Sequence, residues 1–392
     1  MTKPDNPLRG PLQALHGAVV SELSARELVR LLPVTLPTID PNLTPEAIRE
    51  RTRAGLRWYR HSRRANAEML GPHRVHETRN GEVLERLRTA GRSAMVTSLH
   101  LGPFFFVTSE LCDLGHPVSC FAASSTREMW EGEWDRKIER SGWQLEMLPS
   151  DRPSSLLRAA RRLDQGGLLV VYLDPLAAAS PPARNSAGRA IRIDFLGAPL
   201  WVRTAPFRIL ARRGAALIAA ACTVDADGRR ILDLSDPLRP PRDESLPELE
   251  RAIRDCLDWL GSRVVAQPEQ WVGTYQRPLN WLNDQTPPRA PADALARLAS
   301  DLAEAERGNR GTLRVEASEV CALVFQPWSF LIHGPSHRVL RVDDAVARIT
   351  RSATPGAPLR KLRRASRLGP EAFAMEAARL VLAGLARFEP HR

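Results

Sequence analysis

The segment Ser98–Phe105, with the sequence SLHLGPFF, decides how the chain folds around its most informative residue, His100. The apolar run Ser93–Leu99 predicts a buried strand, and the apolar run Phe104–Leu114 predicts a helix, with Gly102 at the junction. A histidine at a strand-to-helix junction can lie beside helix amides, and its ring titrates near neutral pH. The segment therefore predicts an α/β unit with a chemically competent histidine at the end of a strand.

Short apolar runs alternate with amphipathic runs on both sides of this segment. Further strands are expected at Val118–Ala122, Gln144–Leu148, Leu168–Tyr172, Arg189–Phe195, Ala216–Thr223 and Arg230–Leu234. Further helices are expected at Glu82–Ala90, Glu131–Ser141, Ser154–Gln165, Thr204–Arg213 and Leu246–Ala266. Strands spaced by helices of this size predict an α/β fold, a mixed sheet flanked by helices.

The composition predicts further parts outside this sheet. Residues 1–80 are expected to form a helical region packed on the core of an α/β domain at 81–283. A proline-rich stretch at 284–291 predicts a linker. Beyond it, residues 292–392 predict a small C-terminal α+β domain whose closing helix ends at Leu380–Leu385. This block resembles small winged-helix domains that recognise peptides.

The charge of the chain bears on its partners. The chain has 392 residues and a formal net charge of +11, which favours anionic partners such as phosphate-bearing thioesters, acidic carrier proteins and anionic lipid surfaces. The positive charges are almost all arginines spread along the chain. Because no dense basic run is interleaved with aromatic residues, we do not expect nucleic-acid binding.

The cysteines and the apolar runs bear on the compartment. The five cysteines are widely spaced and have no metal-ligand spacing, so we expect reduced thiols in a cytoplasmic protein, no metal site and no cofactor. No apolar stretch approaches the roughly 18 residues that cross a membrane, and the N-terminus lacks the apolar region of a signal peptide. Any membrane contact is therefore expected to be peripheral, on the inner face of the membrane.

Blocks of sequence beyond the histidine segment point to one known family. They are Ser124–Arg127, Ser150–Ser154, Val170–Asp174, Ile193–Pro199, Thr204–Ile218 and Gln267–Arg277. In this order, and over about residues 50–282, they resemble the lipid A (lauroyl/myristoyl) acyltransferases, a lysophospholipid acyltransferase family. The resemblance implies a glycerolipid acyltransferase-like fold. It also implies transfer of a fatty acyl group from an acyl-carrier protein or acyl-CoA thioester to a hydroxyl or amine.

The family's histidine motif usually reads His-x-Gly-Asn-Trp-Glu, and the resemblance implies that His100 is the general base. In the family, the acid five residues later orients the ring, but Phe105 holds that position here. Asp174 follows a strand that is expected to run parallel to the strand before His100. Since parallel strands end at one edge of a sheet, Asp174 is our candidate for the missing partner. A backbone carbonyl or a water molecule remains an alternative.

Other residues complete the predicted site. Gly102 and Phe105 are candidates for substrate contact, and Arg127 and Arg152 could anchor a phosphate or carboxylate through bidentate hydrogen bonds. Trp271 is expected to belong to the core. The acceptor stays open between a lipid, a peptide and a small molecule. A second hypothesis, which Phe105 favours, is a catalytically degenerate family member that binds an acyl chain or a partner protein.

Overall fold

The computed structural model describes most of the chain. Its described residues are 25–68, 75–122, 135–136, 138–150, 152–174, 189–281, 291–316, 319–325, 328–335, 338–353 and 356–390. Contacts divide the chain into two compact units. One unit is Arg57–Gly273, and the other combines Met1–Leu56 with Thr274–Arg392. The sequence-based boundaries lay after residues 80, 283 and 291, so the structure groups the N-terminal region differently.

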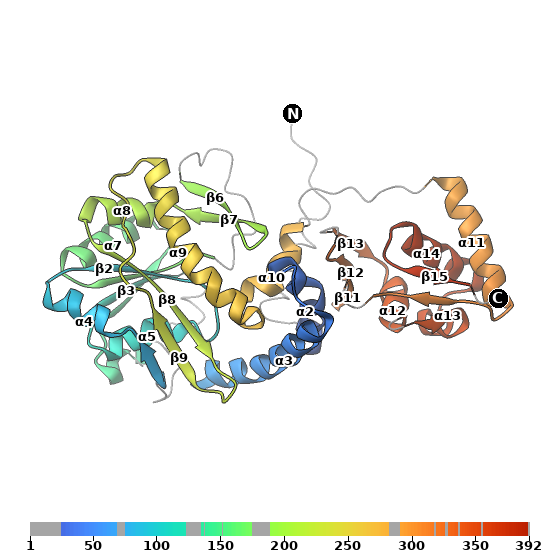
Figure 1. Cartoon of the computed structure of the whole chain (residues 1–392), viewed down its shortest axis with the longest axis horizontal. Coiled ribbons are helices and arrows are strands. Elements are labelled where there is room, and N and C mark those ends of the chain that lie inside the picture. Colours follow the sequence, from blue (N-terminus) through green and yellow to red (C-terminus); the bar gives the residue numbers. More distant parts are fainter. Residues whose placement is uncertain are drawn as a thin grey trace. The chain divides into compact units, whose positions relative to one another are not determined.

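A mixed sheet of seven strands forms the centre of the unit Arg57–Gly273 (Figure 1). Its order is β1-β9-β8-β2-β5-β3-β4, with β8, β2, β5, β3 and β4 mutually parallel and β9 antiparallel to β8. The strands are β1 (Glu77–Arg79), β2 (Ala94–Ser98), β3 (Val118–Ala122), β4 (Leu145–Pro149), β5 (Leu168–Tyr172), β8 (Ala216–Val224) and β9 (Arg230–Leu234). This confirms the predicted α/β class with a mixed sheet.

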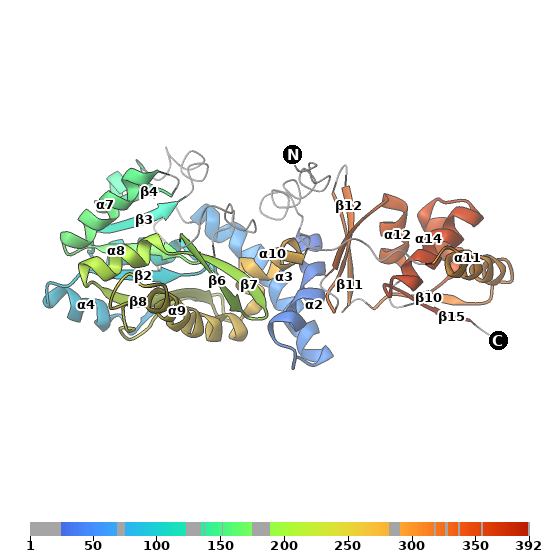
Figure 2. The same cartoon turned by 90° about the horizontal axis from the view of Figure 1, so that it is seen from above.

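Helices cover both faces of this sheet. They are α4 (Glu82–Thr89), α5 (Phe105–Asp113), α7 (Pro153–Asp164), α8 (Ala205–Arg213) and α9 (Leu246–Ala266). Alternate strand residues such as Val96, Val170 and Ile218 pack with α4 and α5 in one buried cluster. In Figure 1, α7, α8 and α9 lie above the strands and α4 and α5 below them, and Figure 2, seen from above, has α8 and α9 in front of the strands. Because helices cover both faces, the central parallel strands are buried along almost their whole length and are apolar on both faces.

Most of the expected elements of this unit are confirmed to within one or two residues, and the differences are local. The sequence missed β1 and β7 (Ala198–Arg203), which pairs with β6 (Ala190–Phe195) as a hairpin. The hairpin turns at Leu196 and Gly197, both at positive φ, and a leucine in that conformation gives no sequence signal of a turn. Of the expected helix at Glu131–Ser141, the described residues 135–136 and 138–141 are helical, whereas the proposed linker at 284–291 lies outside the described residues except for Pro291.

The second unit combines an N-terminal helix and the first half of the next one, α3 (Pro45–Glu68), with the C-terminal block. Its elements include α2 (Ala25–Ile39), α11 (Ala292–Arg307), α12 (Asp344–Ser352), α13 (Leu359–Ser366) and α14 (Pro370–Leu382). Two three-stranded sheets accompany them. One sheet contains β11 (Val320–Phe325), β12 (Trp328–His333) and β13 (Arg338–Val342), and the other contains β14 (Ala357–Pro358), β10 (Thr312–Arg314) and β15 (Arg387–Glu389).

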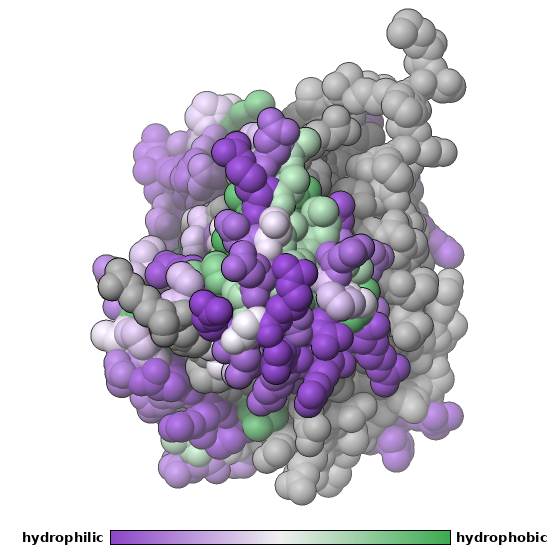
Figure 3. All heavy atoms as spheres, turned by 90° about the vertical axis from the view of Figure 1, so that its right-hand side faces the viewer, coloured by the Kyte–Doolittle hydropathy of each residue, from purple (hydrophilic) through white to green (hydrophobic). Residues whose placement is uncertain are grey.

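Packing within this unit explains why the N-terminal helix belongs to it. Helix α2 contacts β11, and a Cβ atom at Gly334 would come within 2.6 Å of the Val34 carbonyl oxygen. Arg277, on α10 (Val272–Trp281), is buried and donates to the backbone oxygen and hydroxyl of Thr38, and burial lowers the pKa of its guanidinium to about 10. From the side on which α11 lies, the surface is mainly hydrophilic, with small apolar areas (Figure 3).

Within the described parts of the chain, no helix combines the length and the hydropathy that crossing a bilayer requires.

Candidate active site

Two adjacent parallel strands bring His100 and Asp174 together. Ser98 of β2 pairs with Tyr172 of β5, and the backbone N–H of Leu173 donates to the Ser98 carbonyl at 2.9 Å. Each strand then runs two residues further, to His100 in one case and to Asp174 in the other. The common carboxyl edge of parallel strands, which the sequence argument used, thus places both side chains at one point.

The His100 ring and the Asp174 carboxylate are in direct contact. Nδ1 of His100 lies 3.0 Å from Oδ1 of Asp174 and 2.9 Å from the Asp174 backbone oxygen. The backbone N–H of His100 also donates to both carboxylate oxygens, at 2.9 and 3.1 Å. The prediction that Asp174 lies beside His100 is confirmed, whereas its role in catalysis stays a prediction.

These contacts fix the tautomer of the neutral His100 ring. Both neighbours of Nδ1 are oxygen acceptors, so Nδ1 carries the proton and donates it. The lone pair is then on Nε2, for which no hydrogen-bond partner occurs among the described residues. A carboxylate that orients a histidine in this way leaves Nε2 able to accept a proton.

Aromatic side chains surround the His100 ring. The ring of Phe104 meets it edge-on at 4.5 Å between centroids, and the ring of Tyr172 lies 4.9 Å away. The Tyr172 hydroxyl donates to the Phe104 backbone oxygen at 2.8 Å, and burial holds the pKa of this hydroxyl well above its ordinary value. Tyr172 therefore stays protonated and acts as a donor that fixes the Phe104 backbone.

Phe105, five residues after His100, is one ring further from the histidine than Phe104. Its ring lies 3.9 Å from that of Phe104 and packs against the core beneath α5. Phe104, which the sequence argument did not single out, is the phenylalanine whose ring contacts His100. Glu110, an acid on α5, accepts a hydrogen bond from Thr78 of β1 at 2.9 Å and so does not orient the His100 ring.

Gly102 lies in a tight turn between His100 and α5. Its φ is +58°, and a Cβ atom there would come within 2.2 Å of the Cys222 carbonyl oxygen. Its N–H donates to the backbone oxygen of Gln270 at 2.9 Å. Only glycine fits this position, because both the left-handed backbone and the close approach to β8 exclude a side chain. Its predicted contact with substrate is not tested.

Of the two candidate arginines, the structure describes Arg152. Arg152 is exposed and precedes α7, directly after β4, so it lies at the carboxyl edge of the sheet. Arg127 lies outside the described residues. A role for either in binding phosphate or carboxylate stays a prediction.

Trp271 belongs to the site, although the sequence argument assigned it to the core. Its indole N–H donates to Oδ2 of Asp174 at 2.7 Å, and the residue is 5% exposed. The preceding Gln270 bonds the backbone of Val224 at the end of β8 through both ends of its side-chain amide, at 2.6 and 2.9 Å. Both residues belong to the block Gln267–Arg277, which was among the segments used for the family resemblance. The apolar character of Trp271 indicated only that the residue is buried.

The cysteines are poor candidates for a nucleophile. All five are free and buried. Burial raises the pKa of the Cys112, Cys120 and Cys256 thiols to about 12 and raises that of Cys222 further. A thiolate is the reactive form of cysteine, so these four thiols are unreactive near neutral pH. In the described residues, no group of three or more histidine, cysteine or acidic side chains could hold a metal ion.

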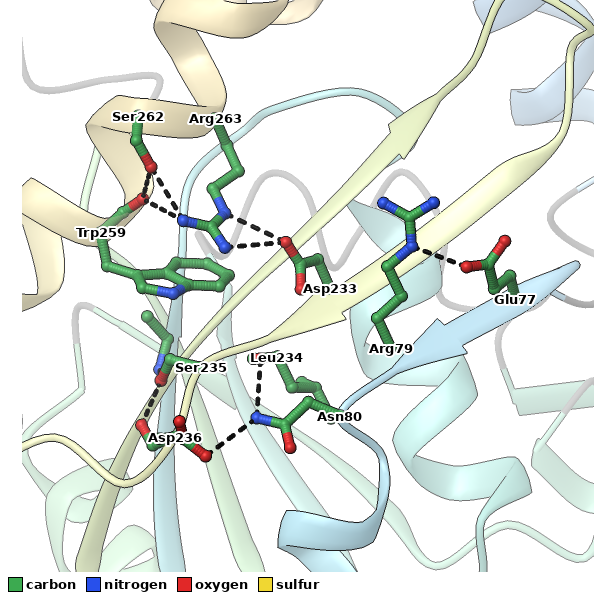
Figure 4. Close-up of polar contacts among 11 residues, drawn as sticks. Glu77, Arg79, Asn80, Asp233, Leu234, Ser235, Asp236, Trp259, Ser262 and Arg263 are labelled. Carbon is green, nitrogen blue, oxygen red and sulfur yellow. Dashed lines mark hydrogen bonds and ion pairs between the residues drawn. The ribbon is translucent and has the colours of Figure 1, made fainter.

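A second polar network lies in the same unit, between β1, β9 and α9 (Figure 4). Two nitrogens of Arg263 donate to Oδ2 of Asp233, at 2.9 and 3.1 Å, and the guanidinium carbon lies 3.6 Å from the centre of the Trp259 ring. Nearby, Asn80 donates to the Leu234 backbone oxygen and to the Asp236 carboxylate. This network joins a sheet edge to a helix and contains no histidine.

Comparison with known proteins adds no name to this geometry. Neither the models of known protein families nor the proteins of established function gave a match to the chain.

Proposed function

We propose that this protein is an acyltransferase in which His100 is the general base. The observation that carries the proposal is the contact of the Asp174 carboxylate with Nδ1 of His100, because it leaves Nε2 as the proton acceptor. General-base catalysis contributes about 10²- to 10⁴-fold to a rate, and an orienting acid supports much of that contribution. Asp174 takes the place of the family's acid, which Phe105 cannot replace.

The reaction moves a fatty acyl group from a thioester to a hydroxyl or amine. Nε2 of His100 accepts the proton of the acceptor as its oxygen or nitrogen attacks the thioester carbonyl carbon. The carbon–sulfur bond then breaks, and the imidazolium returns the proton to the leaving thiolate of acyl-CoA or of an acyl-carrier protein. Asp174 stabilises the imidazolium through the Nδ1 proton while both charges exist.

The finer features of the family belong to the same proposal. They are the glycerolipid acyltransferase-like form of the mixed sheet, a winged-helix-like form of the block at 292–392, and a cytoplasmic location with peripheral contact to the inner face of the membrane. The acceptor would be a lipid, a peptide or a small molecule. Arg127 and Arg152 are the residues proposed to anchor the phosphate or carboxylate of a substrate.

The test is the release of free thiol from acyl-CoA and acyl-carrier thioesters, with intact mass used to detect the acylated product. We expect the unaltered protein to consume one donor class and His100→Ala to reduce the rate to background. His116→Ala is the matched control, since His116 is also buried but lies before β3. Equal rates for the unaltered protein and His100→Ala would contradict the proposal.

A further inference from the structure

Among the described residues, Trp271 is the one residue besides His100 that donates a hydrogen bond to the Asp174 side chain. The carboxylate of Asp174 receives the Nδ1 proton and the backbone N–H of His100, and the Trp271 indole N–H reaches Oδ2 at 2.7 Å. Oδ1 is thereby left to face the ring, at 3.0 Å from Nδ1. We infer that Trp271 is a positioning residue, which holds the Asp174 carboxylate in the orientation that fixes the His100 tautomer.

The electrostatics of the pair support this role. In the part of the chain that the structure describes, no arginine or lysine pairs with Asp174, and its side chain is 8% exposed. A neutral donor such as an indole N–H stabilises a buried carboxylate without cancelling its charge. The charge thus remains available to stabilise a protonated His100, whereas an arginine in the same place would compete with the imidazolium.

The backbone beside Trp271 fixes where the indole points. Residues His100–Gly102 and Gln270–Val272 pair as a short antiparallel bridge, in which Val272 N–H donates to the His100 oxygen at 3.0 Å. The same bridge includes the Gly102 N–H bond to Gln270, and the Gln270 side chain joins it to β8. A shift of Trp271 therefore requires a shift of the histidine turn itself.

The Trp271 ring is held on its other side as well. The ring of Phe195, in the β6–β7 hairpin, meets it edge-on at 5.4 Å between centroids and an interplanar angle of 85°. A Cβ atom at Gly273 would come within 2.2 Å of the indole, so only glycine leaves space for the ring. Such packing restricts the indole to one orientation, the one that presents its N–H to Asp174.

The inference rests on the proposed function only for its kinetic part. Trp271→Phe keeps an aromatic ring against Phe195 and removes the N–H. We expect kcat for thioester consumption to fall about tenfold or more, equivalent to about 1.4 kcal/mol in barrier, with KM for the donor unchanged. An unchanged kcat would overturn the inference.

Trp143→Phe is the matched control. The indole N–H of Trp143 also donates to an aspartate of the same unit, Asp113, at 2.9 Å, on the helix α5 and away from the His100–Asp174 pair. We expect this variant to lose a comparable hydrogen bond and a comparable amount of thermal stability while keeping kcat. Equal falls in kcat for both variants would show that loss of a buried indole bond acts through general stability, which would overturn the inference.

A proton NMR measurement tests the positioning without any activity. The Nδ1–H signal of His100, identified by its loss in His100→Ala, should shift upfield or broaden in Trp271→Phe and stay in place in Trp143→Phe. If the unaltered protein transfers no acyl group but this signal responds, the positioning stands and the proposed function fails. A signal that is identical in all folded variants would overturn the positioning.

The indole signals allow the same test should Trp271→Phe not fold. With ¹⁵N-labelled tryptophan, the N–H signal of Trp271 should move upfield in Asp174→Asn, because a neutral amide oxygen is a weaker acceptor than a carboxylate oxygen. It should also move in His100→Ala, since the carboxylate loses another donor. If neither substitution moves any indole signal, Trp271 does not share this carboxylate and the inference fails.

Discussion

Asp174 and Asp233 are two carboxylates of the same unit, and each lies in a network that includes a tryptophan. Asp233 is 26% exposed, and the Arg263 guanidinium that neutralises it stacks on Trp259. Asp174 is 8% exposed. It accepts hydrogen bonds from the backbone N–H of His100, from the Trp271 indole N–H and from the His100 ring, and the neutral ring carries no charge. The charge of a carboxylate paired with arginine is already neutralised, whereas a carboxylate bound by neutral donors can still stabilise a protonated ring. The comparison separates a structural ion pair from the site at which we propose proton transfer.

The largest expected difference between the two networks is in activity. Asp174→Asn should reduce the rate of acyl transfer by about 10²- to 10⁴-fold, because the amide N–H₂ can donate to Nδ1 and favour the wrong tautomer of His100. Asp233→Asn removes the same charge from the other network and should leave the rate within about twofold. Initial rates with a saturating thioester donor measure both, and similar losses would erase the distinction between the networks.

A smaller difference is expected in backbone rigidity. The Asp174 network includes backbone bonds across the Gly102 turn, whereas the Asp233 ion pair joins two side chains. Gly102→Ala meets both a positive φ and a clash 2.2 Å from the Cys222 oxygen, while Gly115→Ala meets only a positive φ, in open space. We expect Gly115→Ala to lower the free energy of unfolding by about 1–2 kcal/mol and Gly102→Ala to lower it by at least about 2 kcal/mol more.

Urea denaturation monitored by tryptophan fluorescence gives both free energies. Equal losses for the two glycine variants would mean that the turn beside His100 can relax, and the claim of a fixed backbone would be wrong.

The sequence predicted the sheet well for a physical reason. Strands such as β5 (Leu168–Tyr172) and β8 (Ala216–Val224) are buried on both faces and so appear as continuous apolar runs. The rule that parallel strands end at one edge then brought Asp174 to His100 although they lie 74 residues apart. Both inferences need only the local pattern of apolar residues and the direction of the strands, and both can be read from the sequence.

Other features depended on contacts that no local pattern encodes. Trp271 is 97 residues from Asp174, and its apolar character predicted burial correctly while concealing the indole N–H bond. The turn at Leu196 requires a positive φ that leucine rarely adopts. The packing of α2 against β11 joins segments from opposite ends of the chain, so the sequence did not predict which unit would hold α2.

Ionic strength offers a finer test of the two networks. The half-exposed Asp233–Arg263 pair should contribute about 0.2–1 kcal/mol to stability, and most of this contribution should vanish near 1 M salt. The loss of stability in Asp233→Asn should therefore shrink as salt is added. The loss in Asp174→Asn should change little, because the side chains of Asp174 and His100 are largely buried and are screened less by salt. Thermal melts of the three proteins at low and high sodium chloride measure both trends, and a salt-insensitive Asp233→Asn would contradict the assignment.

The smallest effect on activity is expected at Phe105, five residues after His100. In Phe105→Glu, the new carboxylate would replace a ring that packs on Phe104 and on the core beneath α5, so it should lower stability by up to several kcal/mol. Activity should not rise, because Nδ1 of His100 is already bonded to Asp174 and the Phe104 ring contacts both His100 and Phe105. Phe105→Leu is the control for loss of the ring alone.

The opposite result in Phe105→Glu would be equally informative. A rise of at least about tenfold in acyl transfer, worth about 1.4 kcal/mol in barrier, would mean that a carboxylate at position 105 reaches His100 and orients it better than Asp174 does. Asp174 would then be a structural residue, as Asp233 is, whose carboxylate only stabilises the turn at His100. Phe105 would then stand where the orienting acid had been lost. No rise, together with an inactive Asp174→Asn, would instead establish that the orienting acid of this chain comes from the neighbouring strand.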